Sequence, residues 1–260
     1  MFLGIDIGSS SSKAVLLSKE GSVLAAKVVN LGIGTEGPEK VLLKAFTAAE
    51  AERSDVLYTV VTGYGRMSYP DADKQITEIT CHAAGVHFLL PEARTIIDIG
   101  GQDAKVIRLG RDGSVENFVM NEKCAAGTGR FLEVMARVLG RPIEELADLA
   151  DNATRQVSIS SVCTVFAESE VISHLADNKR REDVALGAHT AIAKRIAGMS
   201  MRAGVEPVLA MTGGVALNRA MPKALERELG FPIVLPENPQ TTGALGAATL
   251  ARKTWLKAVA

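Results

Sequence analysis

Two parts of the chain carry the same order of apolar runs and polar turns. Each copy has three runs rich in Val, Ile and Leu, separated by short turns, which predicts three strands. The runs are residues 2–8, 13–18 and 23–29 in the first copy and 95–100, 104–109 and 115–120 in the second. Ile5-Asp6-Ile7-Gly8 returns 92 positions later as Ile97-Asp98-Ile99-Gly100. Two copies are too few for a solenoid, so the repeat predicts a molecule with two related lobes.

The remaining pattern mixes helices with further strands. Helical spacing of apolar residues marks 41–49, 75–89, 131–139, 166–175, 184–199, 219–228 and 242–257, and strands are expected at 58–63, 207–212 and 231–235. This mixture indicates an α/β fold with a mixed sheet in each lobe. We expect lobe I to comprise residues 1–93 plus 240–260, with the C-terminal helix returning to it, and lobe II residues 94–239. The charged segment 178–183 is expected to be a solvated loop.

Composition narrows the class of protein. The 260 residues are 47% hydrophobic and 23% charged, with a formal net charge of −1 and no block of basic residues. Nucleic acid and anionic membranes are therefore not favoured as partners. We expect no signal peptide, because Asp6 interrupts the start, and no transmembrane helix, because no apolar run is long enough. The three cysteines are far apart and odd in number, which favours free thiols and a cytoplasmic location.

The two repeated turns suit a phosphate group. Hydroxyls and backbone N–H groups in a turn can bind phosphate oxygens, and a turn without Cβ atoms permits close approach. Asp6 and Asp98 end their strands, where they can hold a hydrated Mg²⁺, and Gln102 or Asp103 can orient an attacking water. The candidate nucleotide contacts are Ser9, Ser10, Ser11, Ser12, Lys13, Gly100, Gly101, Gln102, Gly213 and Gly214. Each turn alone could be an ordinary solvated turn, but the three motifs in this order favour a nucleotide site.

Two cysteines form a second candidate site. Cys124 and Cys163 each precede a predicted helix, and a helix N-terminus favours the thiolate form that binds metals. Two thiols are half of a four-cysteine cluster site, which two identical subunits would complete. The alternative is that both are small buried apolar residues. Cys81, next to His82 in an apolar helix, is expected to be a packing residue.

Three motifs resemble those of the superfamily of acetate and sugar kinases, heat-shock chaperones and actin. Residues 4–8 resemble its first phosphate motif, residues 97–101 its second, and residues 209–215 its adenosine motif. The resemblance spans the whole chain. It implies two ribonuclease-H-like lobes, the actin-like ATPase fold, with ATP in the cleft between them.

The cysteine segments, residues 124–131 and 161–170, further resemble the ATP-dependent activators of 2-hydroxyglutaryl-CoA dehydratase and their relatives serving other 2-hydroxyacyl-CoA dehydratases and benzoyl-CoA reductases. This resemblance implies a homodimer that shares one [4Fe–4S] cluster through Cys124 and Cys163 of each subunit. It implies that Mg²⁺-dependent hydrolysis of ATP to ADP drives one electron into a 2-hydroxyacyl-CoA dehydratase. The partner that the resemblance favours most is 2-hydroxyglutaryl-CoA dehydratase. A reduced ferredoxin or flavodoxin is the implied electron source, in anaerobic amino-acid fermentation.

Two other functions use the same nucleotide motifs. A sugar or amino-sugar kinase would need a substrate-binding insert and a catalytic Asp base, and neither is identifiable in the chain. An ATP-dependent binding module of the chaperone type would need no cysteines. The cysteine pair favours the activator over both.

Overall fold

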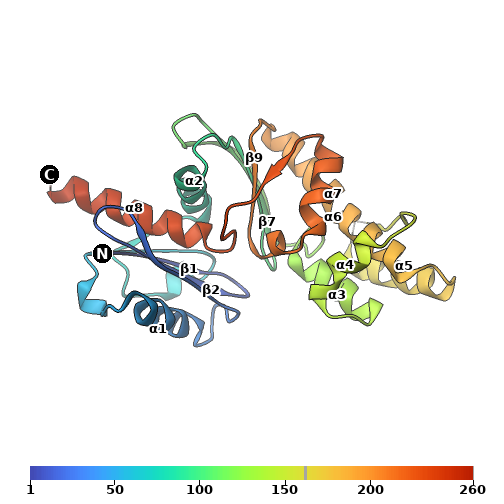
Figure 1. Cartoon of the computed structure of the whole chain (residues 1–260), viewed down its shortest axis with the longest axis horizontal. Helices are drawn as coiled ribbons and strands as arrows, with labels where there is room; N and C mark the ends of the chain where they lie inside the picture. The colour runs from blue at the N-terminus through green and yellow to red at the C-terminus, as the bar shows by residue number, and fades with distance from the viewer. Residues whose placement is uncertain (161–162, 260) are drawn as a thin grey trace. The chain divides into compact units, whose positions relative to one another are not determined.

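The computed structural model describes residues 1–160 and 163–259, so Ser161 and Val162 of the second cysteine segment lie outside it. The chain divides into two compact units. Unit 1 comprises Met1–Ala93, Leu109–Glu116 and Pro236–Ala260, and unit 2 comprises Arg94–Arg108 and Asn117–Leu235. Each unit is built around a mixed five-stranded sheet with helices, as the α/β pattern predicts (Figure 1).

The sheet of unit 1 has the strand order β3-β2-β1-β4-β5. Its strands are β1 (Phe2–Ile7), β2 (Ser12–Leu17), β3 (Val23–Val29), β4 (Tyr58–Thr62) and β5 (Lys74–Gln75). β1 runs antiparallel to β2, the next strand in the sequence, and parallel to β4, which comes from much farther along the chain. The helices of this unit are α1 (Gly37–Ala49), α2 (Glu78–Leu89) and α8 (Thr242–Val259).

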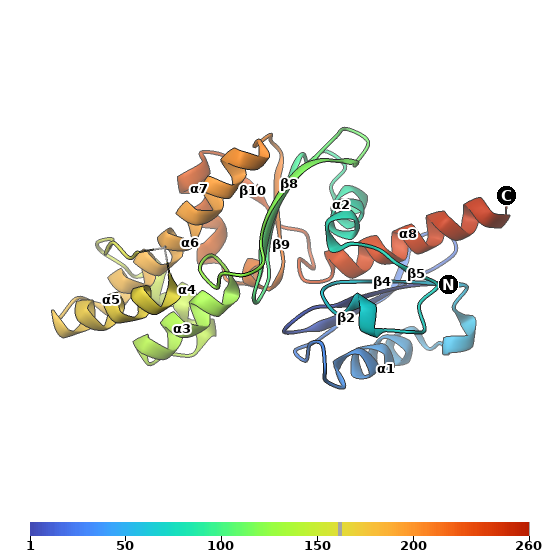
Figure 2. The same ribbon diagram turned by 180° about the vertical axis from the view of Figure 1, so that it is seen from behind.

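The central strand β1 is buried on both faces, which is why its sequence reads as a continuous apolar run. Leu3, Ile5 and Ile7 pack with the apolar side of α1, whereas Phe2 packs with α8 on the opposite face. Figures 1 and 2 show α1 and α8 on opposite sides of this sheet, with α2 beside α8. The C-terminal helix therefore completes the core of the N-terminal sheet.

Small residues let α8 pack very closely on its neighbours. Ala244, Ala247, Ala248 and Ala251 of this helix are fully buried. A Cβ atom on Gly246 would collide with the carbonyl oxygen of Cys81 on α2. The Ala-rich composition of the last helix thus reflects close packing, and it fixes the first turn of α8 against the sheet.

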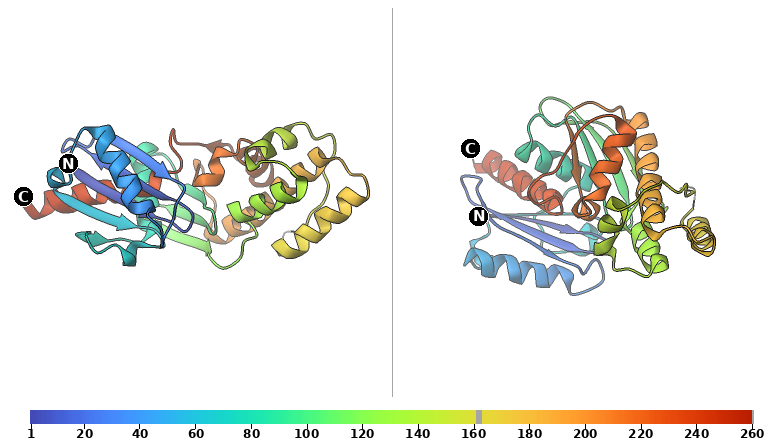
Figure 3. Two further views of the ribbon diagram at one scale, coloured as in Figure 1. Left: turned by 90° about the horizontal axis from the view of Figure 1, so that it is seen from below. Right: turned by 45° about the vertical axis from the view of Figure 1, so that its right-hand side comes forward.

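The sheet of unit 2 repeats this topology with the order β10-β9-β6-β7-β8. Its strands are β6 (Thr95–Ile99), β7 (Ala104–Leu109), β8 (Val115–Asn121), β9 (Leu209–Thr212) and β10 (Ile233–Val234), and β7 and β8 extend past the unit's boundaries. Its helices are α3 (Gly129–Leu139), α4 (Leu146–Asp151), α5 (Thr164–Ala176), α6 (Arg181–Ala203) and α7 (Ala220–Leu229). α6 and α7 lie side by side in both views of Figure 3, and residues of α3, α6 and α7 share one core with the sheet.

The structure corrects two details of the predicted elements. The short helix α4 is absent from the prediction. The charged segment 178–183 is not wholly a solvated loop, because α6 begins at Arg181 and Asp183 is buried in its first turn. The Asp183 carboxylate accepts hydrogen bonds from the backbone N–H groups of Arg155 (2.9 Å) and Thr154 (2.8 Å), and these bonds lower its pKa. In the described residues no helix has the length and apolar character needed to cross a membrane.

The contact between α2 and α8 can be tested by filling it. Gly246→Val should destabilise the protein by about 3 kcal/mol, because the added atoms have no space beside the α2 backbone. Gly198→Ala on α6 is the matched control, since a Cβ atom there meets open space. The control should gain up to ~1 kcal/mol from the better helix propensity of Ala. Urea unfolding of both variants measures the difference, and equal stabilities would refute the close packing.

Candidate functional site

The first predicted carboxylate, Asp6, lies near the end of the central strand of unit 1. The strand register places it between Lys13 on β2 and Thr62 on β4. Lys13 Nζ lies 3.1 Å from Asp6 Oδ2, and Asp6 is 6% exposed. This ion pair offsets much of the cost of burying a carboxylate. Within the described part of the chain, no donor is bonded to the other oxygen, Oδ1.

The serine-rich turn follows directly after β1. The backbone N–H of Gly8 donates to the carbonyl of Ser11 at 3.0 Å, which closes the turn. Ser12 is buried, and its hydroxyl donates to the Leu31 carbonyl at 2.8 Å. Ser9, Ser10 and Ser11 are partly or fully exposed. The turn therefore offers three hydroxyls to a ligand, whereas the fourth holds the turn against the segment that follows β3.

The second predicted carboxylate, Asp98, has the same environment in unit 2. The register places it between Lys105 on β7 and Thr212 on β9. Lys105 Nζ donates to Asp98 Oδ2 at 3.2 Å, and Thr212 Oγ1 donates to Asp98 Oδ1 at 2.8 Å. Lys105 is only 2% exposed and also pairs with Asp103. Asp98 is thus bonded through both carboxylate oxygens and held more tightly than Asp6.

A matching Thr-Gly pair beside each carboxylate was missed in the sequence analysis. Thr62 ends β4 and is followed by Gly63 in unit 1, as Thr212 ends β9 and is followed by Gly213 in unit 2. Both glycines have positive φ, +88° and +87°, and a Cβ atom on either would crowd the carbonyl of the neighbouring central strand. Each of these predicted strands ends in Thr-Gly in the sequence, but only the strand pairing shows that the two pairs occupy matching positions. The full repeated unit is therefore Asp, Lys, Thr and Gly.

The two threonines differ in what they bond. Thr212 donates to Asp98, whereas the buried hydroxyl of Thr62 has no hydrogen-bond partner in the described residues. The thiol of Cys81 lies beside Thr62, although it does not form a hydrogen bond of normal geometry with that hydroxyl. Burial raises the pKa of the Cys81 thiol to about 12, and the carboxylate of Asp6 acts in the same direction. Cys81 is thus an unreactive packing residue, as predicted.

The loop of the second phosphate motif is bonded to the start of α3. The backbone N–H of Gly129 donates to the Gly100 carbonyl at 2.9 Å, and that of Arg130 donates to the Gly101 carbonyl at 2.8 Å. Gln102, at the tip of the same loop, is exposed. These bonds use the otherwise unpaired N–H groups of the first helical turn. The phosphate loop is therefore bonded to the start of α3, and the loop that carries Cys124 leads into this helix.

The two candidate metal ligands occupy different positions. Cys163 is the N-cap of α5, so its thiol lies at the start of that helix. Cys124 lies in the loop before α3, whose N-cap is Thr128. Asn121 Nδ2 braces this loop by donating to the Cys124 carbonyl at 2.8 Å. Both thiols are free and partly exposed, and the described residues contain no group of three or more His, Cys, Asp and Glu side chains suited to a metal.

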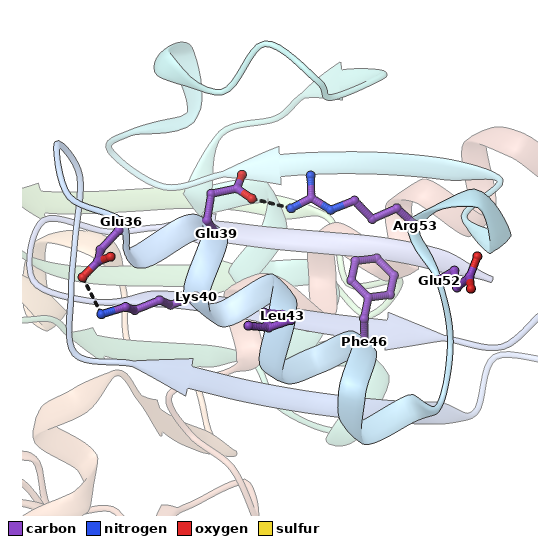
Figure 4. Close-up of a pocket in the computed structure, with 7 residues that line it drawn as sticks. All are labelled: Glu36, Glu39, Lys40, Leu43, Phe46, Glu52 and Arg53. Carbon is purple, nitrogen blue, oxygen red and sulfur yellow. Dashed lines mark hydrogen bonds and ion pairs between the residues drawn. The ribbon is translucent and has the colours of Figure 1, made fainter.

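A surface pocket of about 480 Å³ lies elsewhere on unit 1, along α1 (Figure 4). Its lining residues are Glu36, Glu39, Lys40, Leu43, Phe46, Glu52 and Arg53. Lys40 pairs with Glu36 and Arg53 pairs with Glu39, so these four charges are satisfied within the pocket. None of the predicted site residues lines it, and it is not a candidate for the nucleotide site.

The chain resembles known proteins over nearly its whole length. A model of the BadF/BadG/BcrA/BcrD ATPase family matches residues 3–251. The chain is 52% identical over 249 residues to the 2-hydroxyisocaproyl-CoA dehydratase activator of Clostridioides difficile, covering 96% of this chain and 94% of the relative. It is 46% identical over 252 residues to the (R)-2-hydroxyglutaryl-CoA dehydratase activating ATPase of Acidaminococcus fermentans, covering 96% of each.

Solved structures show the same fold. The activator of the 2-hydroxyisocaproyl-CoA dehydratase from Clostridium difficile with bound ADPNP superposes with a TM-score of 0.95 at 50% identity, covering 100% of this chain and 97% of that one. A ROK family glucokinase from Streptomyces griseus, in complex with glucose and AMPPNP, superposes with a TM-score of 0.56 at 17% identity, covering 97% and 99%. The likeness to the glucokinase concerns the fold alone.

The raised pKa of Cys81 predicts a loss of stability in alkaline solution. Burial raises the pKa of the native thiol to about 12, whereas the unfolded thiol has the ordinary pKa of 9.0. The stability that this group contributes is complete below pH 9 and falls as the pH rises toward 12. Between pH 8 and 10.5, urea unfolding should therefore show a steeper decline for the wild type than for Cys81→Ala. Parallel declines would mean that Cys81 is not shielded from water.

Proposed function

Because the chain belongs to the BadF/BadG/BcrA/BcrD ATPase family, we propose that it hydrolyses ATP and delivers one low-potential electron to a 2-hydroxyacyl-CoA dehydratase, which it thereby activates. The observation that carries the proposal is the pair of hydrogen bonds between the Asp98 phosphate loop and the start of α3, the helix that follows the Cys124 loop. The similar activators are named for dehydratases of different 2-hydroxyacyl-CoA substrates. We therefore propose the partner as a class, to which 2-hydroxyglutaryl-CoA dehydratase belongs.

The two carboxylates suit different tasks at the phosphate end of ATP. Asp6 has an oxygen without a donor, so it is the better placed to hold a hydrated Mg²⁺. Asp98 is bonded through both oxygens, so it contributes fixed negative charge and can hold the ion only through water or a remaining lone pair. The bound Mg²⁺ would neutralise phosphate charge. Phosphoryl transfer depends mainly on such positioning and charge stabilisation.

The two loops supply the groups that hold the phosphates and the attacking water. Ser9, Ser10 and Ser11 offer hydroxyls, and Lys13 a positive charge. The backbone of Gly100 and Gly101 can approach the phosphates closely, because no side chain intervenes. Gln102 is exposed at the loop tip, where its amide can orient water. Gly213 and Gly214 are proposed to contact the ribose or the α-phosphate.

The cysteines fit a [4Fe–4S] cluster shared by two chains. Each chain supplies two free, partly exposed thiols, Cys124 and Cys163, and such a cluster needs four. The Cys81 thiol is excluded by burial. When bound, the cluster would accept and release the electron. We propose a homodimer for this reason, with a reduced ferredoxin or flavodoxin as electron source.

A sugar kinase of the same fold is the alternative. The likeness to the ROK glucokinase is at 17% identity and supports the fold only. Nothing in the kinase reading accounts for two exposed cysteines in unit 2. The activator is therefore favoured.

Removal of charge from the two carboxylates tests the ATPase. Asp6→Asn and Asp98→Asn should each lower kcat for Mg-ATP hydrolysis by roughly 100-fold, the usual effect of losing one charge-stabilising group. Asn keeps the shape of the side chain, and Asp112→Asn in the turn after β7 is the control. Steady-state hydrolysis and the iron content of each variant are measured together. Wild-type rates in both site variants would remove the carboxylates from the mechanism.

Substitution of the cysteines tests the cluster. Anaerobically purified wild type should hold about four iron atoms per two chains. Cys124→Ser or Cys163→Ser should lose the iron and the visible absorption, whereas Cys81→Ala should keep both. Iron analysis and sedimentation of the dimer provide the readouts. An iron-replete, redox-active Cys163→Ser protein would contradict the assignment.

A further inference from the structure

The turn that follows β4 in unit 1 lies over the end of β1, next to the serine-rich loop. The backbone N–H of Gly65 donates to the Ile7 carbonyl at 2.8 Å, and Ser68 Oγ donates to the Gly65 carbonyl at 2.7 Å. Gly63 lies directly against Asp6, since a Cβ atom there would collide with Asp6 Oδ1. Residues 63–66 are therefore held beside the first phosphate loop by both ends of this turn.

Arg66 is folded back within this turn. Its Nη1 donates to the Gly63 carbonyl at 3.1 Å, and its backbone N–H donates to the same carbonyl at 3.2 Å. The side chain is partly buried. The guanidinium is therefore held at Gly63, which itself lies directly against Asp6.

The charge of Arg66 is not compensated locally. Among the described residues no carboxylate forms an ion pair with its guanidinium, while Asp6 already pairs with Lys13 at 3.1 Å. By contrast, Arg53 in the same unit is paired with Glu39. One of the five N–H donors of the Arg66 guanidinium is used by the Gly63 carbonyl, and the others are available to a ligand. Such a planar fork matches the geometry of a phosphate group.

We propose that Arg66 is a further residue of the nucleotide site and that it binds the terminal phosphate of ATP. The proposal rests on the proposed ATPase function. The terminal phosphate carries the largest negative charge of the chain of phosphates, so an uncompensated cation gains most from it. A neighbouring Lys13 and three open serine hydroxyls serve the same anion. Arg66 therefore gives unit 1 a means of distinguishing ATP from ADP.

A purely structural role for Arg66 makes a different prediction. If the side chain only braces the turn through the Gly63 carbonyl, its loss weakens ATP and ADP binding equally. If it binds the terminal phosphate, its loss weakens ATP selectively. Arg66→Gln removes the charge but keeps an amide donor for the Gly63 carbonyl, and Arg66→Met removes both. Arg53→Gln is the matched control for the loss of a positive charge from unit 1.

The experiment is equilibrium binding of ADPNP and of ADP to iron-free protein with Mg²⁺, measured by calorimetry. We expect both Arg66 variants to weaken ADPNP binding by roughly tenfold or more, as for loss of a charged hydrogen bond, and ADP binding by less than about threefold. Arg53→Gln should match the wild type for both ligands. Thermal unfolding confirms that each variant is folded. If neither folds, Arg66→Lys replaces them, and we expect a smaller but still selective loss of ADPNP affinity.

Equal weakening of ADPNP and ADP, or no change in either, would overturn the assignment of Arg66 while leaving the ATPase proposal intact. Wild-type protein that binds neither nucleotide would instead refute the proposed function itself. The two failures are therefore distinguishable in one data set.

Discussion

The structure depends on one repeated constraint, the burial of an aspartate at the end of each central strand. Lys105 and Asp98 are almost fully buried, and the pair is tolerable only because each charge meets the other and further polar groups. The lysine comes from the antiparallel neighbour and the threonine from the parallel neighbour. A slip of one residue in either strand pairing would turn these side chains to the opposite face. The strand register that buries the apolar residues of each sheet therefore also brings the aspartate, lysine and threonine of its site together.

The two halves share this arrangement but differ in how firmly they hold the carboxylate. Asp98 is bonded through both oxygens, whereas Asp6 is bonded through one and its neighbouring Thr62 hydroxyl stays unpaired. A carboxylate with fixed bonds is rigid, and one with an open oxygen can accept a metal-bound water at little cost in reorganisation. The uncompensated cation Arg66 lies on the side of the freer carboxylate. The freer carboxylate and the uncompensated cation are therefore both in unit 1, where the proposed site would meet ligand charge.

Much of this arrangement could be predicted from the sequence, because Asp and Lys recur within short, similar segments. Thr62 and Thr212 were missed, since they lie on the parallel neighbours β4 and β9, whose distance along the chain from β1 and β6 hides the pairing. The contribution of Arg66 depends on a turn folding back over Ile7, which no local pattern indicates. Asp183 was expected in solvent because charged neighbours surround it, yet two backbone N–H groups stabilise it in the first turn of α6. Each of these positions is therefore determined by contacts between segments that are far apart in the sequence.

In unit 2 a short series of contacts links the proposed phosphate loop to the two exposed thiols. The carbonyls of Gly100 and Gly101 accept the first N–H groups of α3, and each such bond contributes about 1 kcal/mol. A change in the shape of the phosphate loop must therefore either move the start of α3 or break these bonds. α3 packs on α5, with Arg137 and Glu168 paired at 3.4 Å, and α5 begins at Cys163. Cys124 lies in the loop that leads directly into α3. Both thiols are thus connected to the same helix, and in the proposed function a nucleotide bound at Gly100 and Gly101 would act on them through it.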